Sequence, residues 1–267
     1  MNPIDHRLAD ALTALVSQAG RAVLEVACSP LAVRTKADGS PVTEADLASE
    51  ALLLPGLERL LPGVPVVSEE SGAATDRLGD LYVVVDPLDG TKEFVGGTGE
   101  YTINVAVVEN DRPVAGFVFL PVRGLLYRGR VGLGAERLAL RVGEPAGQPV
   151  AIRARPRPAD GMVATVSRSH LDERTKSFLD ARGVAARIPY GSAAKFALIA
   201  EGAADVYPRL APTCEWDVAA GHALLAAAGG TVLRPDGSPL PYGRIEEGFR
   251  VPAFVAWGEP PDGRQPA

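Results

Sequence analysis

Hydrophobic residues near the start of the chain recur at the spacing of a helix with one buried face. Between residues 5 and 28, apolar side chains follow one another mostly three or four positions apart, at Leu8, Leu12, Leu15, Val16, Ala19 and Val23. Positions with this spacing share one side of an α-helix. The pattern therefore predicts an amphipathic helix over residues 5–28.

A second helix is predicted to begin near Thr43, after a polar loop at 34–41. Thr43 and Asp46 have the spacing of a capping box, in which each side chain accepts a hydrogen bond from the other residue's backbone N–H group. An apolar run follows them. Pro55 and Gly56 are expected to interrupt or kink this helix, because proline lacks an N–H group and clashes with the preceding turn.

The pattern then changes to short segments that are rich in β-branched and aromatic residues and bounded by turn residues, which is typical of strands. These segments are 64–67, 81–85, 101–108, 114–120 and 125–130. The third and fourth segments flank the turn sequence ENDRP. They are therefore predicted to form an antiparallel hairpin.

Predicted strands and helices alternate in the second half of the chain, as they do in α/β folds. Strands are expected at 162–166, 185–189, around Val206, at 231–233 and at 254–257, and helices at 171–182, 192–201 and 216–228. Between the halves, residues 142–160 contain four prolines, which favours a boundary there. We therefore expect an α+β lobe with an antiparallel sheet over 1–150 and an α/β lobe over 151–267.

Composition narrows the kinds of protein that this pattern can represent. The chain has 267 residues, 46% of them apolar, which is enough for a sizeable core in one large domain or two packed lobes. Its net charge of −6 argues against nucleic-acid binding, which normally needs a basic surface. Small anionic ligands are compatible with this charge, because a few local cations and a metal ion can hold them.

Cysteine content and hydropathy bear on where the protein works. Cys28 and Cys214 lie far apart and have no CxxC partner, so neither a disulfide framework nor a zinc ribbon is indicated. No apolar run approaches ~18 residues, and charges stand where a signal peptide needs an apolar core. We therefore expect no membrane span, and a cytoplasmic location by elimination.

The segment DPLDGT at 86–91 is the strongest candidate for chemistry. A predicted buried strand ends at Asp86, and Asp89 follows three positions later. Two carboxylates on one turn, with the Leu88 carbonyl between them, offer the hard oxygen ligands that Mg²⁺ prefers. Thr91 adds a hydroxyl that could orient a water molecule. An ordinary hairpin turn explains the spacing at least as well, since Asp-Gly is a common turn signal.

Other carboxylates stand in comparable positions. Glu69 and Glu70 follow another short strand. Asp217 opens a nearly all-apolar helix, and Asp46 lies in the first turn of the predicted second helix. Each has a simpler explanation, namely a solvated acidic turn or a helix cap. Together they place carboxylates at strand ends and helix starts without a cluster of His or Cys, which favours magnesium over zinc.

These segments resemble the inositol monophosphatase superfamily of lithium-sensitive, magnesium-dependent phosphatases. The paired glutamates, DPLDGTKEF and WDVAAGHALLAAAGG occur in the order and spacing of that superfamily, over roughly residues 5–257. KADGSPVTEAD, the KEF of DPLDGTKEF, SRSH and GSAAKFALIAEGAADVYPR are similar to its 3'(2'),5'-bisphosphate nucleotidase branch, whereas inositol monophosphatases usually carry TTNF where this chain has TKEF. The resemblance implies a layered α-β-α-β-α sandwich of the inositol monophosphatase and fructose bisphosphatase type, in a monomer or a homodimer.

The resemblance also implies a role for each acid. The ligands of two Mg²⁺ ions are matched by Glu69, Asp86, the Leu88 carbonyl, Asp89 and Asp217, with Asp86 bridging the ions. Glu69 and Thr91 match the pair that positions and activates the attacking water. Asp46 matches an acid linked to water activation and to a weaker third ion. Glu70 matches the second acid of the glutamate pair.

Substrate recognition is expected mainly in the C-terminal lobe. In the nucleotidase branch, the residues that match His170, Ser192, Lys195 and Arg209 contact the nucleotide and its second phosphate. The N–H groups of Gly90 and Thr91 could cradle the phosphate that is removed, as N–H groups at turns and helix starts commonly do, and Asp217 borders it. Without the resemblance, Lys195 and Arg209 are explained equally well as a solvated face, and His170 as a helix cap.

The predicted reaction is hydrolysis of the 3'-phosphate of 3'-phosphoadenosine 5'-phosphate to AMP and phosphate, a reaction of sulfur metabolism. KEF, SRSH and YPR favour this substrate. Two alternatives stay open. The first is an inositol monophosphatase or a broad sugar-phosphate phosphatase, including one for fructose 1,6-bisphosphate, that uses the same metal site. The second is a catalytically silent nucleotide-binding regulator.

Overall fold

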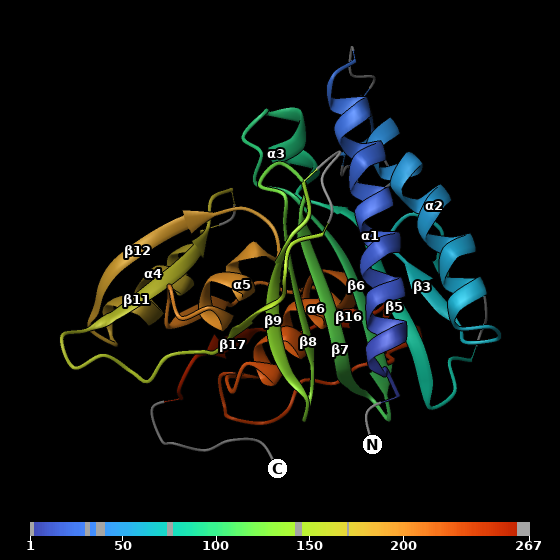
Figure 1. Ribbon diagram of the computed structural model, residues 1–267. Coiled ribbons are helices and arrows are strands. Elements are labelled where there is room, and N and C mark those ends of the chain that lie inside the picture. The colour runs from blue at the N-terminus through green and yellow to red at the C-terminus, as the bar shows by residue number, and fades with distance from the viewer. Residues whose placement is uncertain are drawn as a thin grey trace.

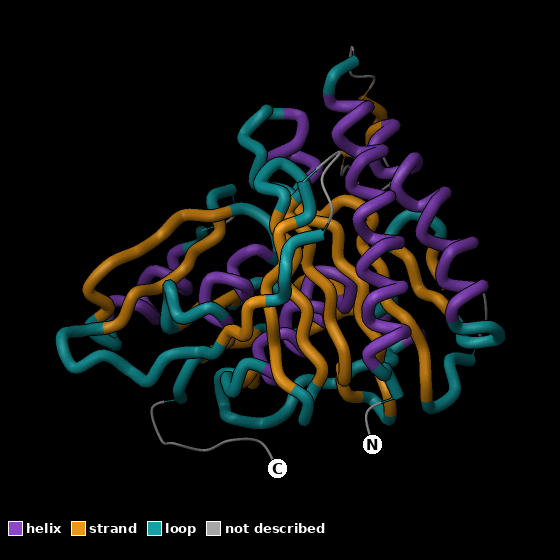
Figure 2. Tube along the Cα trace, viewed as in Figure 1, coloured by secondary structure: helices purple, strands orange, loops and turns teal. Residues whose placement is uncertain are grey.

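The computed structural model describes residues 3–29, 33–35, 41–73, 77–141, 146–169 and 171–260. These residues form two main sheets, with helices outside each sheet and between them (Figure 1). Figure 2 shows the strands in two groups, the large sheet and the smaller sheet to its left. The layers alternate as α-β-α-β-α, which confirms the fold that the resemblance implied.

Two helices, α1 (His6–Ala27) and α2 (Glu44–Leu60), lie side by side on one face of the large sheet (Figure 1). Asp5 caps α1 by accepting a hydrogen bond from the backbone N–H of Leu8 at 2.8 Å. The apolar stripe of α1 is buried, as its periodicity predicted. Both helices therefore begin and pack as the sequence pattern indicated.

The capping box at the start of α2 is also confirmed, since Thr43 and Asp46 exchange side-chain to backbone hydrogen bonds. The expected interruption at Pro55 is wrong, because α2 continues through it to Leu60. Gly56 lies directly against α1, and a Cβ atom there would stand 2.3 Å from Leu15 Cδ1. Tertiary packing therefore supports the helix at the point where local propensity opposes it.

The large sheet has eight strands in the order β10-β9-β8-β7-β6-β5-β3-β4 and is antiparallel except for the β3–β5 pair. The strands are β3 (Val66–Ser68), β4 (Gly72–Ala73), β5 (Leu81–Asp89), β6 (Thr102–Glu109), β7 (Arg112–Leu120), β8 (Leu125–Arg130), β9 (Gly134–Ala139) and β10 (Val150–Ile152). The predicted hairpin is confirmed as β6 and β7. The short β4 and the strands β9 and β10 were not predicted from the sequence pattern.

The middle layer consists of α5 (Ala194–Ala200) and α6 (Glu215–Ala227). α6 packs on β5 to β8 of the large sheet and on β15 of the smaller one. A Cβ atom at Gly116 would stand 2.1 Å from the carbonyl oxygen of Ala220, so only a glycine lets α6 approach β7 this closely. This contact sets how closely α6, including its N-terminal turn, approaches the large sheet.

The smaller sheet has the order β12-β11-β13-β17-β15, with α4 (Glu173–Asp180) on its outer side. Its strands are β11 (Met162–Ser167), β12 (Val184–Tyr190), β13 (Val206–Arg209), β15 (Thr231–Leu233) and β17 (Phe254–Trp257), all close to the predicted segments. The remaining elements are short: α3 (Thr91–Val95), η1 (Ile245–Glu247), and the pairs β1 (Val33–Thr35) with β2 (Pro41–Thr43) and β14 (Thr213–Cys214) with β16 (Arg250–Val251).

Candidate active site

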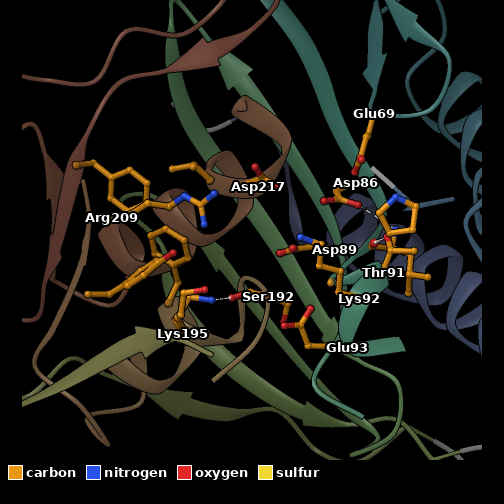
Figure 3. A pocket seen from close by; sticks show the side chains of 18 residues that line it. Glu69, Asp86, Asp89, Thr91, Lys92, Glu93, Ser192, Lys195, Arg209 and Asp217 are labelled. Carbon is orange, nitrogen blue, oxygen red and sulfur yellow. Dashed lines mark hydrogen bonds between the residues drawn. The ribbon is translucent and has the colours of Figure 1, made fainter. Parts of the chain in front are cut away.

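Three carboxylates from distant parts of the chain meet at one end of the large sheet. Asp86 and Asp89 come from β5, and Asp217 comes from the first turn of α6. Each offers an oxygen atom that lies within 4.8 Å of the others. Figure 3 shows Glu69 beside this group. A dense set of hard oxygen ligands such as this suits a divalent cation of the Mg²⁺ type.

The segment DPLDGT is not the hairpin turn that its spacing allowed. β5 continues to Asp89 and pairs with β6 on both sides of a bulge, with Asp86 opposite Asn104 and Asp89 opposite Thr102. The bulge folds back on itself, because the Leu88 N–H group donates to Asp86 Oδ1 at 3.0 Å. Bulges re-aim side chains, and this one turns two acids of one strand towards the same point.

The bulge is also held from behind by α2. Ser49 Oγ donates a hydrogen bond of 2.7 Å to the Pro87 carbonyl. Thr91 Oγ1 lies 3.3 Å from Asp46 Oδ1 and 3.4 Å from the Leu88 carbonyl oxygen. Asp46, which caps α2, therefore also contacts the hydroxyl of Thr91, for which a role in orienting water was predicted.

Asp89 accepts three hydrogen bonds through Oδ2, and one of them links the two sheets. The donors are Asn104 Nδ2 at 3.2 Å, Thr102 Oγ1 at 3.5 Å and the Ala193 N–H group at 2.6 Å. Ala193 precedes α5, in the second half of the chain. The orientation of this carboxylate is therefore fixed by residues on both sides of the site.

Asp217 is both a cap and a member of the cluster. It accepts hydrogen bonds from Thr213 Oγ1 and, at 3.2 Å, from the Cys214 N–H group. The bond from the Cys214 N–H group is one half of a capping box at the start of α6. The simple explanation offered by the sequence is thus correct but incomplete, because the same side chain reaches the acids of β5.

The electrostatics of the cluster favour a cation. The pKa of Asp86 is raised well above its usual value by burial and by the carboxylates of Glu69, Asp89 and Asp217, in that order. Burial and Asp217 raise the pKa of Asp89 to about 7, against an opposing effect of Lys195. Asp86 Oδ2 is buried and has no hydrogen-bond partner. A buried acceptor of this kind is costly unless a ligand satisfies it, so the residues present fit a metal ion.

The acids line one side of a cavity of about 250 Å³. Glu69, the Leu88 backbone region, Gly90 and Thr91 also line it. Asp46 is 1% exposed and touches the cavity only through Thr91. Glu70 lies outside the cavity lining.

Cationic and polar residues of the second half of the chain line the opposite side (Figure 3). Ser192, Lys195 and Arg209, which the resemblance implied as contacts of the nucleotide, line this side. Lys195 is 3% exposed, and its Nζ donates to the Ser192 carbonyl at 2.5 Å. Arg209 Nε is buried without a partner. His170, the fourth predicted residue, lies outside the described residues.

Several lining residues were not predicted as site residues. They are Pro41, Lys92, Glu93, Ser167, Phe196, Tyr207, Val218 and Phe254. Lys92 and Glu93 belong to KEF, a segment for which only a similarity to the nucleotidase branch, and no role in the site, was predicted. Phe196, Tyr207 and Phe254 form an aromatic group with ring centroids 5.3–5.8 Å apart. Their signal in the sequence is that of ordinary core residues, so only the fold reveals them.

A layered α-β-α-β-α fold with a carboxylate cluster between its two sheets defines a class of phosphatases, and the chain belongs to it: the inositol monophosphatase family model matches residues 5–253. Within that family, the chain is similar to 3'(2'),5'-bisphosphate nucleotidase CysQ of Escherichia coli K12. The two are 40% identical over 255 residues, which cover 92% of this chain and 99% of the relative. CysQ of Salmonella typhimurium LT2 is 39% identical over 250 residues, which cover 90% of this chain and 97% of the relative.

Solved structures agree with this placement. CysQ from Bacteroides thetaiotaomicron superposes with a TM-score of 0.79 at 35% identity, covering 94% of this chain and 98% of the other. The 2'AMP-bound SaIMPase-II shares the fold, with a TM-score of 0.72 at 22% identity over 95% of this chain and 90% of the other.

No helix among the described residues is long and apolar enough to cross a membrane.

Proposed function

We propose that this protein is a Mg²⁺-dependent phosphatase that hydrolyses the 3'-phosphate of 3'-phosphoadenosine 5'-phosphate to give AMP and phosphate. The main observation in support is a carboxylate cluster, with Asp86 buried and Asp89 and Asp217 half-buried, that faces Lys195 and Arg209 across one small cavity. The nucleotidase names of relatives near 40% identity over 92% of the chain support the choice of substrate.

The proposed ligands of two Mg²⁺ ions are Glu69, Asp86, the Leu88 carbonyl, Asp89 and Asp217. The unpartnered Asp86 Oδ2 and the mutual repulsion of the acids support this set. Bound ions of this kind neutralise charge on the phosphate and lower the pKa of a bound water. Asp86 lies between Glu69 and Asp89, which is consistent with a shared ligand (Figure 3).

Glu69 and Thr91 are proposed to position the attacking water. When Thr91 donates its hydroxyl hydrogen to Asp46 or to the Leu88 carbonyl, the lone pairs of its oxygen are left to accept from water. One proton of that water is then hydrogen-bonded to Thr91, and Glu69 accepts the other proton as general base. Attack on phosphorus in line with the leaving ribose oxygen needs positioning and charge neutralisation, so no covalent intermediate with the protein is required.

Substrate recognition is proposed to divide between the lobes. The lobe of residues 1–150 supplies most acids and the backbone of Gly90 and Thr91 beside the reacting phosphate. The lobe of 151–267 supplies Asp217 and the groups for the nucleotide and the second phosphate, namely His170, Ser192, Lys195 and Arg209. The partnerless Nε of Arg209 supports this division, because a buried donor that lacks a protein acceptor is ready for an anionic ligand.

Steady-state kinetics with a panel of phosphate esters tests the proposal. We expect the specificity constant for 3'-phosphoadenosine 5'-phosphate to exceed those for inositol 1-phosphate and fructose 1,6-bisphosphate by at least about tenfold, a difference of roughly 1.4 kcal/mol in transition-state stabilisation. A higher constant for either of the other esters would refute the assigned substrate and leave a sugar- or inositol-phosphate phosphatase. No Mg²⁺-dependent phosphate release from any ester would indicate a silent regulator.

A further inference from the structure

Three segments that mark the nucleotidase branch in sequence meet at the rim of the cavity. Residues 92–94 (KEF) lie in α3, residues 167–169 are the last residue of β11 and the two that follow it, and Gly191 and Ser192 follow β12. Two carboxylates from the first half of the chain, Glu93 and Glu100, join these segments. The hydrogen bonds of Glu93 and Glu100 described below do not involve the carboxylates of Asp86, Asp89 and Asp217.

Glu100 connects the ends of two strands of the smaller sheet. Its carboxylate accepts Arg168 Nε at 2.7 Å and Nη2 at 2.6 Å, and it also accepts the Gly191 N–H group at 2.9 Å. Arg168 Nη2 donates to the Pro189 carbonyl at 3.0 Å as well. Burial raises the pKa of Glu100, but the bonds from Arg168 and Gly191 outweigh it, so the pKa lies below its usual value. The carboxylate is thus ionised at neutral pH.

Glu93 makes the second connection. It is 8% exposed, lines the cavity, and accepts Ser169 Oγ at 2.6 Å. Gly191 packs between the two acids, since a Cβ atom there would stand 2.5 Å from the Glu100 carbonyl oxygen and 2.8 Å from Glu93 Cγ. The loop that follows β12 is therefore in direct contact with the segment 93–100.

This loop leads into α5, which carries Lys195. Ser192 has a φ of 53°, in the left-handed region that non-glycine residues adopt only when their surroundings hold them there. The Ser192 carbonyl accepts Lys195 Nζ at 2.5 Å, and the next N–H group, of Ala193, donates to Asp89. The position of the Lys195 ammonium thus depends on the loop, and the loop depends on Glu93, Glu100 and Asp89.

We propose that Glu93 and Glu100 are positioning residues that set substrate specificity, by holding the loop 190–193 at the separation from the acid cluster that a substrate with two phosphates requires. This inference rests on the proposed function. A substrate with one phosphate and no second anchor uses the acid side alone. Loss of either connection therefore raises KM for the bisphosphate nucleotide far more than it lowers turnover, because Asp89 keeps the bonds from Thr102 and Asn104 that do not depend on the loop.

Glu93→Ala and Glu100→Ala test this with two substrates. We expect KM for 3'-phosphoadenosine 5'-phosphate to rise about tenfold, since charge-assisted hydrogen bonds are lost, with kcat within about twofold. KM and kcat for p-nitrophenyl phosphate should stay within about twofold, which also shows that the variants fold. Glu93→Gln retains an oxygen acceptor for Ser169 and should restore most of the wild-type KM.

A double-mutant cycle separates positioning from direct contact with the substrate. If Glu93 acts through Ser169, then Ser169→Ala and the double variant Glu93→Ala, Ser169→Ala have the same raised KM as Glu93→Ala. A wild-type KM in Ser169→Ala together with a raised KM in Glu93→Ala would overturn the positioning role. Arg187→Ala is the matched control, because it removes an ion pair of the same lobe, to Asp180, away from the cavity.

The outcomes also distinguish this inference from the function on which it rests. If the wild-type protein hydrolyses p-nitrophenyl phosphate but not the bisphosphate nucleotide, the proposed substrate is wrong. If the wild-type protein hydrolyses both and Glu93→Ala and Glu100→Ala leave both KM values unchanged, the proposed substrate stands and the positioning role is refuted.

Discussion

At the scale of single residues, the site contains two aspartates, Asp86 and Asp89, whose pKa is raised by burial and by neighbouring carboxylates. Asp86 is 1% exposed and has neighbouring acids on three sides. A protein tolerates such a group when a ligand compensates it, because an isolated buried charge costs several kcal/mol. Residues whose burial and charge destabilise the metal-free protein are therefore expected to contribute most to binding the ion.

Asp89→Asn should abolish Mg²⁺-dependent phosphate release, with a loss of roughly 100-fold or more in kcat, because one charged ligand of the cluster becomes neutral. Phosphate release at saturating nucleotide measures the effect. Asp80→Asn is the control, since Asp80 is exposed and immediately precedes β5, away from the cluster. Retention of more than a tenth of the activity in Asp89→Asn would show that Asp89 is not a ligand of an essential ion.

The metal-free protein should lose stability as pH rises through the range set by Asp89. The pKa of this carboxyl is about 7 in the folded protein, whereas an unfolded aspartate titrates near ~3.9. Between these values the folded state holds a proton that the unfolded state has released, so this group lowers the free energy of unfolding as pH rises from about 4 to about 7.

Thermal melts in a chelator, at pH values from 4.5 to 8, measure this contribution as a difference between two proteins. The melting temperature of Asp89→Asn minus that of the wild type should increase by several degrees with pH and level off above about 7. A difference that does not change with pH would contradict the raised pKa. Using the difference removes the contribution of carboxylates that do not interact with Asp89.

At the scale of elements, α6 and β5 do most of the positioning. The bulge in β5 brings Asp86 and Asp89 to one point, and the close packing of α6 on the large sheet brings Asp217 to the same point. Gly116 and Gly129 both lie directly under α6, where any Cβ atom would overlap it. A shift of this helix therefore moves a carboxylate of the site.

Gly116→Val should destabilise the protein by roughly 1–3 kcal/mol and lower its activity, because the added atoms push α6 away from β7. Urea unfolding and phosphate release measure the two effects. Ala186→Val adds similar volume at an exposed position of β12 and should change neither. A Gly116→Val protein of normal stability would show that α6 does not need this close contact.

At the scale of the whole molecule, the proposed metal site ties together parts of the chain that are distant in sequence. Its residues come from β5 and from the start of α6, and Glu69 follows β3. A ligand that binds only the folded arrangement stabilises it by mass action. Stability and metal concentration should therefore be linked through these residues.

Mg²⁺ at about 100 times its dissociation constant should stabilise the protein by roughly 2.7 kcal/mol, which for a chain of this size raises the melting temperature by about 5–10 °C. Differential scanning fluorimetry with and without Mg²⁺, at constant ionic strength set with NaCl, measures the shift. Asp217→Asn should lose most of it. An equal shift in Asp217→Asn and the wild type would place the bound ion elsewhere.

Much of the fold was predictable because its signals are local. The helical period over 5–28, the Thr43–Asp46 capping box and the hairpin of β6 and β7 all depend on residues that are close in sequence. β9 and β10 were missed because β9 lacks a run of β-branched residues and β10 is only three residues long. The continuity of α2 through Pro55 depends on packing against α1, which no local signal encodes.

The sequence by itself selected the acids, Lys195 and Arg209 as candidate site residues, since motif spacing and the resemblance single them out without a structure. It could not decide whether DPLDGT was a turn, whether Asp217 was more than a cap, or whether Glu93 lay at the rim of the cavity. Tertiary structure decided these, because each depends on distances between segments far apart along the chain. It shows a bulged strand, a capping acid that also faces the cluster, and a rim where KEF, residues 167–169 and the loop after β12 meet.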